Sequence, residues 1–75
     1  MLLTDKELVK ASKAAIDRVR PQTALMEQVA VWRLVIENRP RASVAQITNW
    51  TFDIYDTVTA EREKERRSAR GGRHV

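Results

Sequence analysis

The segment that most constrains the fold is residues 24–36, ALMEQVAVWRLVI, which carries only three polar residues: Glu27, Gln28 and Arg33. Wound as a helix, the segment has one continuous apolar face, formed by Leu25, Val29, Trp32 and Ile36. Two further sides are also apolar, one with Val31 and Val35 and the other with Ala30 and Leu34. A helix that is apolar on most of its circumference must be covered on most of its circumference. We therefore predict a helix that lies between its neighbours and is also covered by a second copy of the chain or by another partner.

The length of 75 residues allows one domain, and a core of this size gives marginal stability without an additional staple. The chain has no cysteine, and its single histidine, His74, is next to the C-terminus. Disulfides and thiolate metal sites are therefore excluded, and we expect neither a metal site nor a cofactor. Self-association is the remaining way to enlarge the core, so we predict a homodimer.

The first helix is predicted over residues 4–20. Thr4 and Glu7 have the spacing of a capping box, and Leu3 and Leu8 have that of a hydrophobic staple. The apolar stripe that follows consists mainly of small residues, so a neighbouring helix can approach closely. The stripe contains Leu8, Ala11, Ser12, Ala15, Ile16 and Val19.

The second helix is predicted over residues 22–38, opened by Pro21 or capped by Thr23, and ended by Pro40. The third segment has two interpretations, because residues 49–55 alternate like a strand. However, Ser43 and Gln46 form a second capping box, and a helical wheel sorts the whole segment into an apolar and a polar side. We therefore predict an all-α fold of three helices, near residues 4–20, 22–38 and 43–67, with the second helix central.

The positive charge is concentrated at the C-terminal end. Residues 1–60 carry eight Lys/Arg and seven Asp/Glu, whereas residues 61–75 carry six and three. We expect a helical domain over residues 1–60, followed by a charged helix extension and a disordered basic tail over residues 61–75. Ion pairs four residues apart, such as Glu63 with Arg67, should stabilise the extension.

Catalysis is not expected. Asp53 and Asp56 are neighbours on the third helix, but no histidine, cysteine or lysine is in register with them. The chain has no Gly-rich phosphate loop, nucleophile elbow or metal-ligand cluster. The central apolar segment is too short and too polar to span a bilayer, and no signal peptide is visible, so we expect a cytoplasmic protein.

The sequence favours a small regulatory or accessory protein that binds another protein through an apolar and aromatic helical surface. Trp32 is expected in the core, and the interface is expected to contain Val31, Val35, Trp50, Phe52 and Ile54, with core packing as the alternative for Trp50. The alternative is a small DNA-binding regulator with a helix-turn-helix-like unit and a basic tail. Its candidate contacts are Lys6, Lys10, Lys13, Arg39, Arg41, Arg62, Arg66, Arg67, Arg70 and Arg73. This alternative is disfavoured because its recognition helix would turn Asp53 and Asp56 toward a polyanion.

Overall fold

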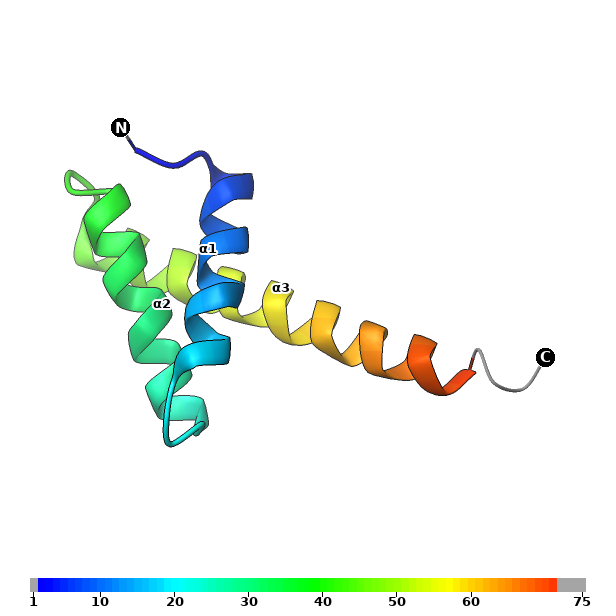
Figure 1. Cartoon of the computed structure of the whole chain (residues 1–75). Helices are drawn as coiled ribbons and strands as arrows, with labels where there is room; N and C mark the ends of the chain where they lie inside the picture. Colours follow the sequence, from blue (N-terminus) through cyan, green and yellow to red (C-terminus); the bar gives the residue numbers. More distant parts are fainter. Residues whose placement is uncertain (1, 72–75) are drawn as a thin grey trace.

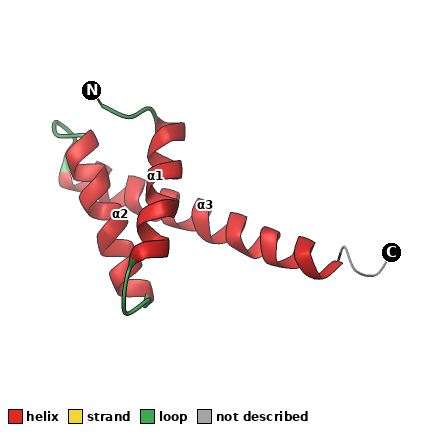
Figure 2. Cartoon of the chain, viewed as in Figure 1, coloured by secondary structure: helices red, strands yellow, loops and turns green. Residues whose placement is uncertain are grey.

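The computed structural model describes residues 2–71, with side chains described for residues 2–68. Within this range the chain forms three α-helices and no strand: α1 (Asp5–Arg18), α2 (Ala24–Asn38) and α3 (Val44–Gly71) (Figures 1 and 2). Each helix packs against the other two. The predicted all-α fold of three helices is confirmed, including the helical interpretation of residues 49–55.

Side chains at the start of each helix explain where the helices begin. The Thr4 hydroxyl accepts a hydrogen bond from the Glu7 backbone N–H at 3.2 Å, and the Glu7 carboxylate accepts one from the Thr4 N–H at 2.9 Å. Ser43 and Gln46 form the same reciprocal pair at 3.2 and 2.9 Å. The hydroxyl of Thr23 accepts from an N–H in the first turn of α2. All three caps satisfy backbone donors that a helix leaves without intrahelical partners.

The core lies where the three helices meet, and its buried apolar residues are Leu8, Ile16, Val31, Val35, Ile54 and Val58. Helix α1 turns a stripe with a spacing of four residues inward, and the middle residue of this stripe is Ser12, which is fully buried. The buried stripe of α1 therefore places one small side chain between two large ones.

The orientation of α2 differs from the sequence prediction. Val31 and Val35, predicted in an interface between molecules, are fully buried in the core of the single chain. Trp32, predicted in the core, is exposed. The physical reason is polar pairing: Glu27 and Asn38 lie on the same side of α2 as the two valines, and both find hydrogen-bond partners on other elements because this side faces inward.

Helix α3 has 28 residues, which corresponds to about 42 Å at a rise of about 1.5 Å per residue. Its C-terminal half extends beyond the other two helices (Figure 1). The predicted Glu63–Arg67 ion pair is present at 3.5 Å, and Glu63 also lies 3.8 Å from Arg66. The helix continues to Gly71, beyond the predicted end near residue 67, because no helix breaker precedes Gly71. None of the described helices has the length and hydropathy needed to cross a membrane.

Candidate protein-binding face

The outer side of α2 carries large apolar side chains in contact with solvent. We define the α2 face as Leu25, Val29, Trp32 and Ile36 of α2 together with Phe52 of α3, and their exposed fractions are 68%, 42%, 41%, 43% and 48%. The four α2 residues follow one another at intervals of four, three and four residues, which keeps them on one side of the helix. Scattered apolar residues are normal on a protein surface, whereas a continuous apolar patch is typical of a binding site.

The α2 face includes a hollow between α2 and α3. Its volume is about 280 Å³, and it is lined by Leu25, Gln28, Val29, Trp32, Thr48, Thr51 and Phe52. None of the lining residues carries a charge, and two of them are aromatic. The hollow can therefore accept an apolar side chain or the side of a helix, but it offers no group that selects a charged ligand.

Of the five interface residues predicted from sequence, only Phe52 lies on the α2 face. Val31, Val35 and Ile54 belong to the core. Trp50 is half-buried, and the guanidinium of Arg39 lies 5.3 Å from its ring centroid. The four α2 residues of the face were recognised in the sequence as one apolar stripe. What the sequence did not indicate is that this stripe points outward.

Arg39 was a candidate phosphate contact, but in the structure it holds the N-terminal segment against the corner between α2 and α3. One guanidinium nitrogen lies 2.6 Å from the Asp5 carboxylate, and the other donates to the Leu3 carbonyl at 2.9 Å. Together with the Trp50 ring, these contacts leave the side chain only 18% exposed. The guanidinium also donates to the Asn38 carbonyl at 2.7 Å, so Arg39 ties the N-terminal segment to the end of α2.

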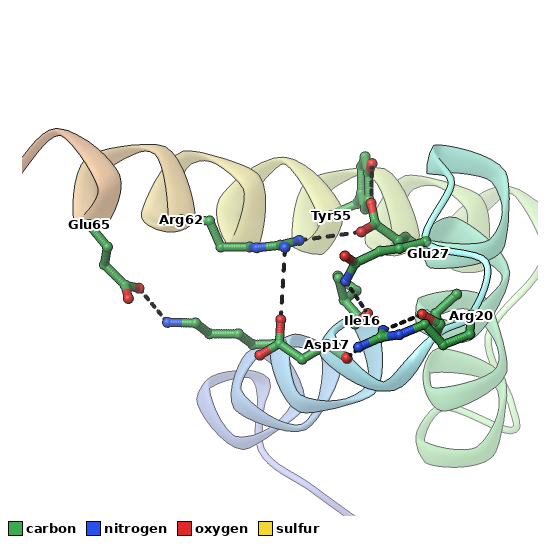
Figure 3. A network of polar contacts seen from close by, with 10 residues as sticks. Ile16, Asp17, Arg20, Glu27, Tyr55, Arg62 and Glu65 are labelled. Atoms are coloured by element: carbon green, nitrogen blue, oxygen red, sulfur yellow. Dashed lines mark hydrogen bonds and ion pairs between the residues drawn. The ribbon is translucent and has the colours of Figure 1, made fainter. Parts of the chain in front are cut away.

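Arg62 was a second candidate and belongs to a polar cluster that joins all three helices (Figure 3). The Glu27 carboxylate on α2 accepts a hydrogen bond from the Tyr55 hydroxyl at 2.9 Å and one from Arg62 at 3.3 Å. Arg62 also lies 3.9 Å from the Asp17 carboxylate on α1. The Glu27 side chain is only 11% exposed, so this charge depends on its partners.

The same cluster changes the acidity of Tyr55. Burial raises the pKa of its hydroxyl, and the hydrogen bond that the protonated hydroxyl donates to Glu27 raises it further. The neutral phenol is therefore favoured in the folded chain.

The remaining basic candidates do not form a uniform positive surface. Lys13 binds Glu65, and this hydrogen bond raises the pKa of the Lys13 ammonium group. Arg66 and Arg67 pair with Glu63. Lys6, Lys10 and Arg41 are exposed, and Lys6 and Lys10 share a hollow between α1 and α3 with two acidic residues, Glu7 and Glu61. The Arg70 side chain and the whole of Arg73 lie outside the described residues.

Asp53 and Asp56, the only carboxylate pair considered for catalysis, are both exposed on α3. Among the residues that the structure describes, no three His, Cys, Asp or Glu side chains come together as metal ligands. Comparison of the chain with protein-family models, curated proteins and solved structures found no match.

Proposed function

We propose that this chain is a small non-catalytic accessory protein, with a regulatory role, that binds another protein molecule through the α2 face. The observation that carries the proposal is the continuous exposure of Leu25, Val29, Trp32 and Ile36 beside Phe52. When a partner removes such apolar surface from water, the complex gains about 25 cal/mol of free energy for each Å² that is buried.

The composition of the face supports a protein as the partner. Trp32 and Phe52 line the hollow from two different helices, and aromatic residues at the centre of an interface contribute a large share of its binding free energy. Both residues lie inside regular helices, α2 and α3, so little backbone order has to be gained on binding. We expect Trp32 to be the dominant contact.

A DNA-binding function receives less support from the geometry. Arg39, Arg62 and Lys13 lie in ion pairs with acidic residues far away in the sequence, and Arg66 and Arg67 share Glu63. Each of these pairs would have to be broken or shared before a phosphate could bind. Binding driven by phosphate contacts would also weaken steeply as the salt concentration rises.

Photo-crosslinking in the cells that express the chain tests the proposal. A photoreactive benzoylphenylalanine in place of Trp32 keeps an aromatic side chain on the face. The matched control carries the same group in place of Asn49, an exposed position on α3 outside the hollow. We expect a discrete protease-sensitive adduct from position 32 and none from position 49. Equal labelling at the two positions, or adducts removed by nuclease, would contradict a protein-binding α2 face.

A further inference from the structure

We infer that the occupant of the α2 face is a second copy of this chain, with the two α2 helices packed antiparallel about a two-fold axis. The inference rests on the proposed function, in which the α2 face is the protein-binding surface, and it names the partner.

The spacing of the exposed residues is that of a helix–helix seam. Leu25, Val29, Trp32 and Ile36 repeat at intervals of four, three and four residues, which is the a/d pattern by which two helices pack along their length. Leu8, Ser12 and Ile16 of α1 repeat instead at intervals of four and are covered within the chain. The α2 stripe therefore has the pattern of a helix pair, but α3 of the same chain covers it only in part, and its residues stay 41–68% exposed.

Antiparallel packing also makes the stripe complementary to itself. A two-fold axis midway between residues 29 and 32 places Trp32 opposite the partner's Val29, a large side chain against a small one. The same axis places Leu25 opposite the partner's Ile36, two side chains of similar size. In a parallel pair each Trp32 would meet the partner's Trp32 in one layer, and the helix dipoles would be aligned unfavourably.

The area of the face fits a small specific dimer. At about 200 Å² for an aromatic side chain and about 120 Å² for an aliphatic one, the five exposed fractions amount to roughly 350 Å² of apolar surface. Homodimer interfaces are about 65% apolar, so an interface built on this face covers roughly 550 Å² per chain, or about 1,100 Å² in total, which is above the about 1,000 Å² expected of a specific interface.

The charge distribution permits the contact as well. The whole chain carries a formal charge of +4, which disfavours random self-association. The α2 face and the other residues that line the hollow are uncharged. Two copies can therefore meet at this face without placing like charges in contact, and their attraction should be insensitive to salt.

Sedimentation equilibrium of the full chain at several concentrations, in low and high salt, tests the inference. We expect twice the 8.6 kDa mass of one chain at both salt concentrations. Trp32→Glu should weaken the dimer by roughly 100-fold or more, because each dimer buries two copies of Trp32. Leu2→Glu adds the same charge at an exposed apolar residue away from the face and should leave the dimer intact.

Circular dichroism of each variant shows whether it remains folded, and Ile36→Lys provides a second test of the face if Trp32→Glu unfolds. A wild-type chain that stays monomeric at every concentration overturns the inference. If the monomer still gives a protein adduct from position 32, the proposed function stands with a different partner, whereas a monomer without any adduct overturns both.

Disulfide trapping tests the antiparallel arrangement, and the absence of natural cysteines makes it clean. Under mild oxidation, a mixture of Leu25→Cys and Ile36→Cys chains should form mixed disulfides, because the two-fold axis places these residues opposite each other. Either variant alone should form few dimers. Efficient crosslinking of Leu25→Cys with itself would indicate parallel helices and overturn the proposed arrangement.

Discussion

Replacing Glu27 by Gln tests whether the polar cluster between the three helices stabilises the fold. The carboxylate accepts hydrogen bonds from Tyr55 and Arg62, and a hydrogen bond to a charged group contributes about 1.5–3 kcal/mol. The amide of Gln retains one acceptor oxygen for Tyr55 but turns an N–H toward the Arg62 cation. Arg62 is 30% exposed and can turn partly to water, so we expect a loss near the lower end of the range, about 2 kcal/mol.

Thermal unfolding followed by circular dichroism measures this loss. For a domain of this size, about 1 kcal/mol shifts Tm by about 4–8 °C, so Glu27→Gln should lower Tm by about 10 °C. Glu37→Gln, at an exposed position of the same helix, should change the free energy of unfolding by less than about 0.5 kcal/mol. In a double-mutant cycle, Glu27→Gln and Arg62→Met should be non-additive, because each change alone removes the interaction between the two side chains. Equal losses for the two glutamate variants, or strict additivity with Arg62→Met, would refute the proposed role of the cluster.

Three further predictions concern single side chains. The raised pKa of Tyr55 means that the folded chain binds this proton more tightly than the unfolded chain, so stability should fall as the pH rises above about 10. Ultraviolet titration reports Tyr55 directly, because it is the single tyrosine, and a midpoint below that of the unfolded chain would contradict the prediction. The buried Ser12 hydroxyl has no hydrogen-bond partner among the described residues, so Ser12→Ala should raise Tm, whereas Ser12→Leu should overfill the space and lower it. A lower Tm for Ser12→Ala would indicate a hydrogen bond that this account lacks. Thr4→Ala removes a helix cap and should cost about 1 kcal/mol in denaturant unfolding, while an unchanged midpoint would show that the cap contributes nothing.

The positions of the helices could be predicted from sequence because their signals are local. Thr4 with Glu7 and Ser43 with Gln46 lie three residues apart, and both pairs form in the structure. The second pair also decided between helix and strand for the following segment. Caps of this kind depend on neighbouring backbone groups and hardly at all on the rest of the fold.

The orientation of α2 could not be predicted in the same way. Both the Trp32 stripe and the Val31–Val35 stripe are apolar, so hydrophobicity alone does not decide which of them turns inward. In the structure the Val31–Val35 stripe turns inward and joins one buried cluster with residues of α1 and α3. Glu27 lies on the same buried side of α2 as Val31 and Val35. A charged residue is not expected on a buried side until its hydrogen-bond partners in the folded chain are known.

The roles of the arginines also depend on contacts between residues far apart in the sequence. Arg39 pairs with Asp5 at a separation of 34 residues, and Arg62 pairs with Glu27 at a separation of 35. In the sequence alone, Arg39 is a cation beside the connection between the second and third helices, and Arg62 is one of many charges in the helix extension. The sequence indicates no acidic partner for either of them. The fold brings a carboxylate to each of these two side chains.

Helix α2 turns its Trp32 stripe outward, and we propose that the stripe binds protein. Thiol labelling of Val35→Cys and Ile36→Cys tests this claim at two adjacent positions, one fully buried and one 43% exposed. In dilute protein, the thiol at position 36 should react about 1,000-fold faster than the thiol at position 35. The buried thiol reacts only when the structure opens locally, and an opening free energy of about 4 kcal/mol slows its reaction by about this factor. The labelling rate at position 36 should fall as the protein concentration rises, because a bound partner covers this position, while the slow rate at position 35 should stay constant. Equal rates at the two positions, or faster labelling at position 35, would contradict the account.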